Sequence, residues 1–167
     1  HSYTGELIST GDNTDRTADI QNELNQYGHV RLGAGLYCID SIYLPENALI
    51  EGCGANTILK RSGTSIAIVV ANNNCTIQNL KFKGEWDAQP GEDTDKTQSE
   101  VGIHVGREVK TVAISNCFFD GLTHSGIRLV NTGTSVKSVV VTNCEFTNNR
   151  VGAYLDASEY ACFSGCV

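Results

Sequence analysis

Apolar residues recur at helical spacing in only one stretch of the chain, close to its start. Three of them lie three or four residues apart, which places them on one face of a helix. Thr14 or Asp15 is suited to cap the N-terminus of such a helix, and Gly28 is a typical stop. The pattern therefore predicts a helix over residues 15–27. Its apolar face consists of Ile20, Leu24 and Tyr27.

Beyond Gly28 the pattern changes to short runs in which apolar and polar residues alternate. The runs read HVRL, LYCI, SIYL, ALIEG, TILK and SIAIVV, and they are bounded by glycine or asparagine. Alternation with a period of two is typical of β-strands with one buried face. The chain holds 17 Gly and only 2 Pro, which suits many tight turns between short strands. The remainder of the chain is therefore predicted to be all-β.

One ten-residue pattern occurs three times. Each copy has an apolar residue third, an asparagine fifth, a leucine or cysteine sixth and a phenylalanine eighth. A further copy begins at 161–167, where Phe163, Gly165 and Cys166 take the first three of these positions. The complete copies are CTIQNLKFKG (75–84), VAISNCFFDG (112–121) and VVVTNCEFTN (139–148).

A second, shorter pattern follows each complete copy. Equivalent positions recur about every 22 to 27 residues, apart from one longer step that contains an insertion at 85–100. A repeat of this length with several short strands predicts a β-solenoid, in which like strands of successive coils pair in parallel about 4.8 Å apart. A leucine-rich repeat would need a leucine signature that is missing here, and an immunoglobulin-like sandwich would not repeat its columns. The second pattern comprises GIHVG (102–106), GIRLV (126–130) and GAYLD (152–156).

Asparagine and cysteine columns fit this solenoid. Asn79, Asn116 and Asn143 are expected at tight corners, because asparagine tolerates the left-handed backbone conformation, and their side chains are expected to hydrogen-bond from coil to coil. Three of the seven cysteines replace Leu80 of the first copy, which favours buried thiols packed as small apolar residues. A strained disulfide between stacked coils and a metal site are the alternatives. The three cysteines are Cys117, Cys144 and Cys166.

Alternation within the second pattern separates inward from outward residues. His104, Arg128 and Tyr154 are predicted to point outward, as one column on adjacent coils. Tyrosine can stack on a sugar ring and arginine can hold a carboxylate or hydroxyls, so the column is a candidate binding surface. A solvated face of mixed polar residues is the alternative. The inward residues are Ile103, Val105, Ile127, Leu129, Ala153 and Leu155.

The insertion at 85–100 precedes this column and is expected to overhang one edge of it. It carries the only tryptophan, Trp86, and an exposed tryptophan on a long loop favours binding, with a mobile acidic loop as the equal alternative. Asp93, Asp95 and Glu100 offer carboxylates for a calcium ion, but their spacing does not reproduce a known calcium loop. The sequence therefore predicts no cofactor and no metal site. The acidic residues are Glu85, Asp87, Glu92, Asp93, Asp95 and Glu100.

Composition limits the partners of the protein. A net charge of −7 argues against nucleic acid and anionic lipid surfaces, and no apolar run reaches the roughly 20 residues that span a bilayer. The 167 residues suit one domain. Because the chain lacks methionine, opens with HSYTGELIST and ends at FSGCV, we expect residues 1–167 to be the N-terminal part of a longer protein.

Residues 11–60 resemble the opening of the pectate-lyase-like superfamily. The resemblance rests on Gly11-Asp12-Asn13, the helix at 15–27, a V-x-L-x-x-G-x-Y strand at 30–37 and an apolar strand ending in G-x-G at 49–54. This superfamily comprises right-handed parallel β-helices of polygalacturonases, pectate lyases and bacteriophage tailspikes. The resemblance implies an all-β, right-handed parallel β-helix with a short N-terminal capping α-helix and coils from about 30 to 167.

The resemblance also implies where a site would lie. The family builds its sugar-binding groove on the strand face that carries His104, Arg128 and Tyr154, and we add Trp86 and Arg107 as binding candidates. The Asn-x-Asp, Asp-Asp and Gly-His-Gly motifs of polygalacturonases do not occur. Arg128 fits the arginine base of pectate lyases, although the calcium-binding acids are missing. Two carboxylates complete the catalytic candidates, Asp156 close to Arg128 and Asp120 approaching it across the loop.

The sequence thus predicts a polysaccharide-binding β-helix from a phage tailspike or a bacterial surface or secreted protein, extracellular or virion-associated. A glycoside hydrolase or polysaccharide lyase acting on acidic or capsular polysaccharide is one hypothesis, and a non-catalytic adhesin or structural fibre module is the other. A homotrimer is expected only from the resemblance to tailspikes. The sequence does not decide between the two hypotheses.

Overall fold

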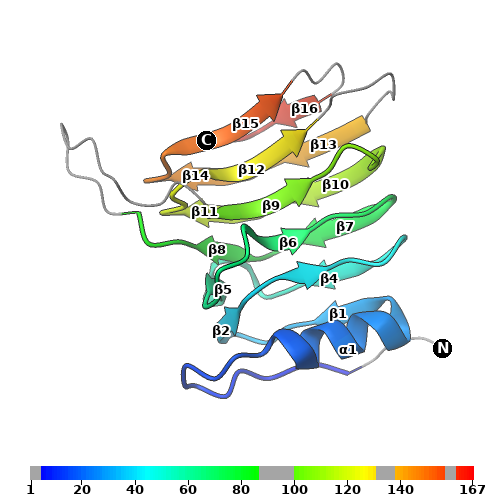
Figure 1. The fold of residues 1–167 in the computed structure, drawn as a ribbon, viewed down its shortest axis with the longest axis vertical. Coiled ribbons are helices and arrows are strands. Elements are labelled where there is room, and N and C mark those ends of the chain that lie inside the picture. Colours follow the sequence, from blue (N-terminus) through cyan, green and yellow to red (C-terminus); the bar gives the residue numbers. More distant parts are fainter. Residues whose placement is uncertain (1–4, 87–99, 131–137, 157–160) are drawn as a thin grey trace.

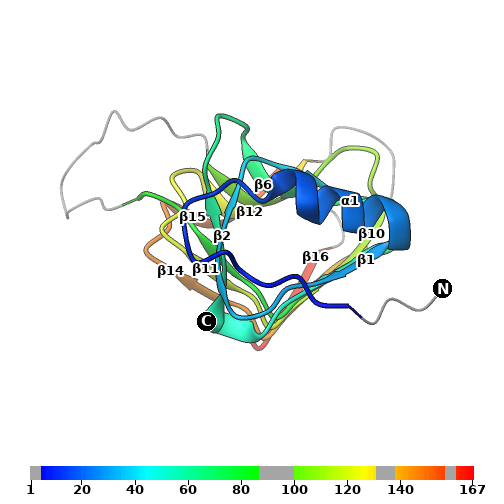
Figure 2. The same ribbon diagram turned by 90° about the horizontal axis from the view of Figure 1, so that it is seen from below.

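Three parallel β-sheets wind around a common axis and form a β-solenoid (Figure 1). The structure is a computed structural model and describes residues 5–86, 100–130, 138–156 and 161–167. Viewed along the axis, the coils superimpose on one another (Figure 2). The predicted all-β solenoid with one helix near the start of the chain is confirmed.

Each sheet collects one strand from successive coils, and in the described residues the last strand, β16, extends only the first sheet. The first sheet contains β1 (His29–Arg31), β4 (Leu49–Glu51), β7 (Cys75–Gln78), β10 (Thr111–Ser115), β13 (Ser138–Thr142) and β16 (Ala161–Ser164). The second sheet contains β2 (Gly35–Ile39), β5 (Thr57–Arg61), β8 (Lys81–Lys83), β11 (Phe118–Asp120) and β14 (Glu145–Thr147). The third sheet contains β3 (Ile42–Tyr43), β6 (Ala67–Val70), β9 (Val101–Val105), β12 (Ser125–Val130) and β15 (Val151–Asp156). A short 3-10 helix, Gly54–Asn56, precedes β5.

The core consists of columns of identical or similar side chains. Phe82, Phe119 and Phe146 stand in register on the second sheet. Their rings stack nearly parallel, with centroids 5.1 Å apart for the lower pair and 4.9 Å apart for the upper pair. Such stacking adds to the free energy gained by burying the rings. The predicted apolar column of the first sheet is also confirmed by its register, and it contains Ile77, Ile114, Val141 and Phe163.

Asparagine forms the corners between the first and second sheets, as predicted. Asn79, Asn116 and Asn143 have φ angles of 58°, 52° and 53°, within the left-handed region. Gly165 takes the equivalent position in the following coil with a φ angle of 65°. The expected hydrogen bonds between the side chains of this asparagine column stay a prediction.

The cysteines that follow these corners are buried thiols. Cys117 and Cys144 are almost fully buried, Cys166 is partly buried, and all seven cysteines of the chain are free. Burial raises the pKa of the Cys117 thiol well above its usual range, so this group is a neutral core side chain. The preferred interpretation from the sequence is confirmed for Cys117 and Cys144, and the disulfide alternative is wrong.

The helix α1 (Thr17–Tyr27) lies below the first coil, next to β1 (Figure 1). It buries Ile20 and Leu24, and it ends at Gly28, which adopts a φ angle of 66° as predicted. The predicted start at Asp15 is wrong by two residues. Asp15 forms a parallel bridge with Cys38 instead of entering the helix, and its carboxylate accepts the Thr17 N–H at 2.8 Å. In the described part of the chain, no helix has the length and apolar character to cross a membrane.

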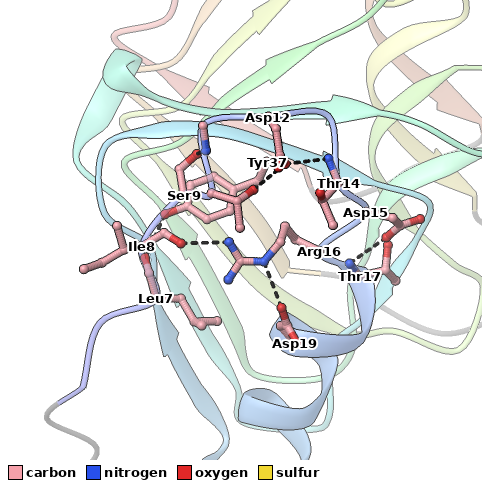
Figure 3. A network of polar contacts seen from close by, with 12 residues as sticks. Leu7, Ile8, Ser9, Asp12, Thr14, Asp15, Arg16, Thr17, Asp19 and Tyr37 are labelled. Atoms are coloured by element: carbon pink, nitrogen blue, oxygen red, sulfur yellow. Dashed lines mark hydrogen bonds and ion pairs between the residues drawn. The ribbon is translucent and has the colours of Figure 1, made fainter.

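Arg16 ties the segment before the helix to the first coil (Figure 3). Its side chain is almost fully buried and donates to Asp19 at 2.8 Å and to the Ile8 carbonyl at 2.7 Å. The guanidinium also lies over the Tyr37 ring, 5.7 Å from its centroid. The Tyr37 hydroxyl donates to the Leu7 carbonyl at 2.7 Å, which closes the network.

We expect Phe119→Ala to lower the free energy of unfolding by about 3–5 kcal/mol, because it removes the central ring of a buried stack and leaves a cavity. Urea unfolding followed by circular dichroism measures this loss. The matched control is Phe118→Ala, since the neighbouring Phe118 points to the outer face and is only partly buried. Equal losses for the two variants would contradict the assignment of Phe119 to the core.

Candidate functional site

The outer face of the third sheet carries one continuous column of side chains. Tyr43 pairs in register with Val70, Val70 with His104, His104 with Arg128, and Arg128 with Tyr154. The flanking residues of β12 are fully buried, whereas the side chains of the column are partly or largely exposed. The predicted outward column of His104, Arg128 and Tyr154 is therefore confirmed as a geometric feature.

One inward residue differs from the prediction. Leu155 stands in register with the buried Leu129, yet 44% of its surface is exposed. The reason is that β15 is the last strand of the third sheet in the described part of the chain, so no coil covers Leu155 from above. The predicted inward direction of Leu155 is correct, but a core side chain becomes fully buried only when a coil packs on each side of it.

A cleft of about 250 Å³ lies over this column from Tyr43 up to Arg128. Its base combines aromatic, aliphatic and cationic side chains with two serine hydroxyls. None of the described side chains that line the cleft is acidic. Mixed apolar and hydrogen-bonding surfaces of this kind suit a small polar ring such as a sugar unit. The lining residues are Ser41, Tyr43, Ser65, Ile66, Ala67, Val70, His104 and Arg128.

The wall of the cleft is formed by the turn that connects β5 to β6. The Ser65 N–H donates to the Asp40 carboxylate at 3.1 Å, and Arg61 Nε donates to the Ser65 carbonyl at 2.8 Å. At Gly63, a Cβ atom would overlap the Asp40 carboxylate. The position of Ser65 thus depends on Asp40, Arg61 and Gly63. These contacts fix the turn, so the wall of the cleft is a defined part of the fold.

Arg128 offers the strongest binding group of the cleft. Its Nε atom is buried and has no hydrogen-bond partner among the residues that the structure describes. A buried donor without a partner costs free energy, which an oxygen atom of a ligand would recover. The guanidinium is also suited to hold a carboxylate or adjacent hydroxyls.

His124 contributes to this face, although the sequence placed it only in a turn. It immediately precedes β12, and its ring lies 5.3 Å from that of Tyr154 at an angle of 71°. Its Nδ1 atom lies 2.9 Å from the Ser125 hydroxyl. Burial lowers the pKa of His124, and the positive charges of Arg128 and Arg150 lower it further.

Asp120 lies on the second sheet and is paired with lysines, not with Arg128. Its carboxylate is 2.8 Å from Lys83 Nζ and 3.7 Å from Lys81 Nζ. Burial alone would raise the pKa of Asp120, but the two lysines hold it below the usual 3.8. The expectation that Asp120 approaches Arg128 is therefore corrected, because strand pairing aligns Asp120 with Lys83.

The other candidates occupy three different places. Asp156 ends β15 and, by alternation, shares the outer face with Tyr154. Trp86 is partly buried and therefore less exposed than expected, and its backbone N–H donates to the Gly121 carbonyl at 2.7 Å. Arg107 is exposed in the turn after β9. None of these residues lines the described cleft, and their proposed roles in binding or catalysis stay predictions.

Glu100 is turned into the protein. Its Oε1 atom accepts the Glu85 N–H at 3.1 Å, its own N–H donates to the Thr123 hydroxyl at 2.9 Å, and burial raises the pKa of its carboxyl. Asp93 and Asp95, the other calcium candidates, lie outside the described residues. Within the described ranges, no three His, Cys, Asp or Glu side chains form a cluster that could hold a metal ion.

Several lining residues were missed in the sequence. Ser41, Tyr43 and Val70 come from the SIYL and SIAIVV runs, which are strands of the same sheet in lower coils. The alternation within those runs would have revealed Tyr43 and Val70, had the column been extended downward. Ser65 and Ile66 are the first two residues of the SIAIVV run, but they precede β6, so the alternation within that strand does not place them.

Comparison with known proteins agrees with this architecture. The family model described as right handed beta helix region matches residues 3–167. A crystal structure of a proposed glycosyl hydrolase from Parabacteroides merdae matches with a TM-score of 0.50 and 17% sequence identity, covering 97% of each chain. At this identity the likeness shows the fold alone. No curated protein sequence matches the chain.

The family match spans nearly the whole chain and agrees with the parallel register of all three sheets. It also confirms the right-handed parallel β-helix that the resemblance of residues 11–60 implied. The chain therefore belongs to the right-handed β-helix family.

Proposed function

We propose that this protein binds polysaccharide along the outer face of the third sheet. The observation that carries the proposal is the cleft built on the His104–Arg128 column. In it a sugar ring would meet an exposed aromatic side chain, Tyr43, together with hydroxyl and guanidinium donors. The solvent-facing surface beside the cleft continues to a second exposed tyrosine, Tyr154.

The direction of the column suits a chain-like ligand. Like side chains of successive coils follow one another at about 4.8 Å, so a saccharide lying along the solenoid axis would contact a new coil at each step. Tyr43 lies at the lower end of the column and Tyr154 at its upper end. An extended ligand could therefore stack on both rings while Arg128 holds its polar groups between them.

Binding is better supported than cleavage. Hydrolysis of a glycosidic bond needs two carboxyl groups roughly 5–9.5 Å apart. Asp120 is engaged by lysines on another sheet, and Asp156 lies beyond the cleft. In the lyase hypothesis Arg128 would be the base, and in the hydrolase hypothesis the acids would come from later coils or from a partner. Both stay secondary to binding in this proposal.

A polysaccharide ligand suits an extracellular or virion-associated protein, such as a section of a phage tailspike or of a bacterial surface or secreted protein. A homotrimer, expected by analogy with tailspikes, belongs to the same proposal. A non-catalytic adhesin or fibre module would bind polysaccharide without a pair of carboxylates. Because none of the described residues lining the cleft is acidic, the cleft favours this module over an enzyme. A panel of capsular and plant polysaccharides, assayed for binding and for new reducing or unsaturated ends, separates the hypotheses.

We expect Arg128→Gln and Tyr154→Ala each to weaken binding of a polysaccharide identified in that panel by about tenfold, since each removes about 1–2 kcal/mol of ligand contact. Isothermal titration calorimetry measures the change. Tyr27→Ala is the matched control, because Tyr27 is an exposed tyrosine at the end of α1, just before β1 of the first sheet, and does not line the cleft. Unchanged affinity in both test variants, or an equal loss in the control, would contradict the proposed groove.

Asp120→Asn separates a structural role from a catalytic one. We expect binding to be unchanged and stability to fall by about 1 kcal/mol at neutral pH, because a partly exposed ion pair is lost. Since the folded pKa of Asp120 lies below the usual 3.8, its contribution is complete well above that pH. It disappears as the pH falls through the folded pKa. Urea unfolding of both proteins between pH 7 and about pH 3 tests this convergence, and loss of ligand cleavage at full stability would instead indicate a catalytic role.

A further inference from the structure

Positive charge gathers at the upper edge of the cleft, in a protein whose net charge is −7. Arg128 projects from β12, His124 precedes the same strand, and Arg150 precedes β15 one coil above. His124 and Arg150 occupy equivalent places in their coils, directly before strands that pair in register. The positive charges of both arginines act on the His124 ring.

The ring of His124 is held in place by its neighbours. Tyr154 packs edge-on against it at 5.3 Å, and Ser125 Oγ lies 2.9 Å from its Nδ1 atom. A ligand would therefore meet the other ring nitrogen, Nε2. On β12, the strand that follows His124, Arg128 presents the buried Nε that has no partner among the described residues. His124 and Arg150 are neighbours through the register of β12 and β15, and Arg128 projects from β12 on the same outer face. An anion bound by these donors would satisfy them.

We propose that His124, Arg128 and Arg150 form a binding site for an oxyanion, such as a sulfate, phosphate or carboxylate group. If the protein binds polysaccharide as proposed above, the oxyanion is a substituent of the bound saccharide, and this assignment rests on the proposed function. A free oxyanion would occupy the site whether or not the protein binds saccharide. The cleft below would then hold the sugar ring, and this site would select the charged group attached to it.

The titration of His124 makes the site dependent on pH. In the free protein the pKa of His124 lies below its usual 6.5, so the ring is neutral at pH 7. A bound anion stabilises the protonated ring and raises this pKa. Between the free and the bound pKa, binding therefore takes up a proton, and affinity rises as the pH falls, by up to about tenfold per pH unit.

Other ionisable groups face His124 from the elements packed against it. The guanidinium groups of Arg128 and Arg150 act on the ring through their charge, and the ring of Tyr154 packs against it. Glu100 contributes its backbone carbonyl, which accepts the backbone N–H of His124 at 2.9 Å, while burial raises the pKa of the Glu100 carboxyl. His104 and Asp156 lie on the same outer face of the sheet. His104 also lines the cleft, so it is a second histidine close to a ligand bound there.

The test uses inorganic sulfate and the imidazole resonances of the full chain. We expect NMR titration to show that sulfate raises the pKa of His124, whose signals are assigned by their loss in His124→Gln. Arg150→Gln should weaken sulfate binding about tenfold, since a charge-assisted contact is lost from an exposed residue whose replacement leaves the fold intact. Lys60→Gln, which removes one positive charge from the second sheet, is the matched control and should bind sulfate like the parent.

An unchanged His124 pKa in the presence of sulfate would overturn the proposal, as would equal sulfate affinity of Arg150→Gln and the parent. A second arm compares a sulfated galactan with the same galactan after removal of its sulfate esters. Stronger binding of the sulfated form that is lost in Arg150→Gln supports a saccharide substituent as the ligand. If the protein binds sulfate but neither galactan, the anion site is supported, and its use for a substituent of this saccharide is contradicted. This outcome distinguishes failure of the proposed function from failure of the anion site.

Discussion

Parallel backbone pairing between coils, always in the same register, is the interaction on which the rest of this protein depends. It aligns Ile77 with Ile114 and Val141 in the first sheet, and Phe82 with Phe119 and Phe146 in the second. A slip of one residue would turn each of these apolar side chains toward solvent. Asparagines in the left-handed conformation turn the backbone in the same way at the corner of each coil. The register of the first sheet is therefore carried over to the second.

The same register assigns a separate chemistry to each outer face. On the second sheet it brings Lys83 beside Asp120, and the two charges satisfy each other. On the third sheet it brings His104 beside Arg128 and Arg128 beside Tyr154, a combination with positive charge and aromatic rings but no paired carboxylate. A carboxylate neutralised by lysine contributes to stability, whereas cationic and aromatic groups above an open cleft are available to a ligand. This difference is why the third sheet, and not the second, is the candidate binding surface.

The lower end of the solenoid shows how a polar group can complete an apolar stack. Arg16 is buried between α1, the segment before it and the ring of Tyr37, and its contacts with Asp19, the Ile8 carbonyl and Tyr37 replace contacts with water. The helix covers the apolar end of the first coil with Ile20 and Leu24. At the upper end, Leu155 stays exposed because β15 has no further strand above it in the described residues.

The sequence by itself determined the coil, the corners and the direction of each strand residue. These features follow from alternation and from the repeat, which are local or periodic, so Asn116, Cys117 and Phe119 could be assigned without a structure. The start of the helix was missed because Asp15 pairs with Cys38, a contact between distant residues. The partner of Asp120 was missed because the identity of a neighbour one coil away depends on the register of the second sheet.

Only the tertiary structure decided where a ligand can enter. The cleft exists because the turn at Ser65 is held over the sheet by Asp40 and Arg61, and no periodic pattern encodes a turn that occurs once. The packing of His124 against Tyr154 likewise joins side chains from different coils, whose orientation depends on their surroundings. Alternation in the sequence predicts which face of a strand a side chain points to. The groups that surround the side chain are determined by three-dimensional packing, and ligand binding depends on those groups.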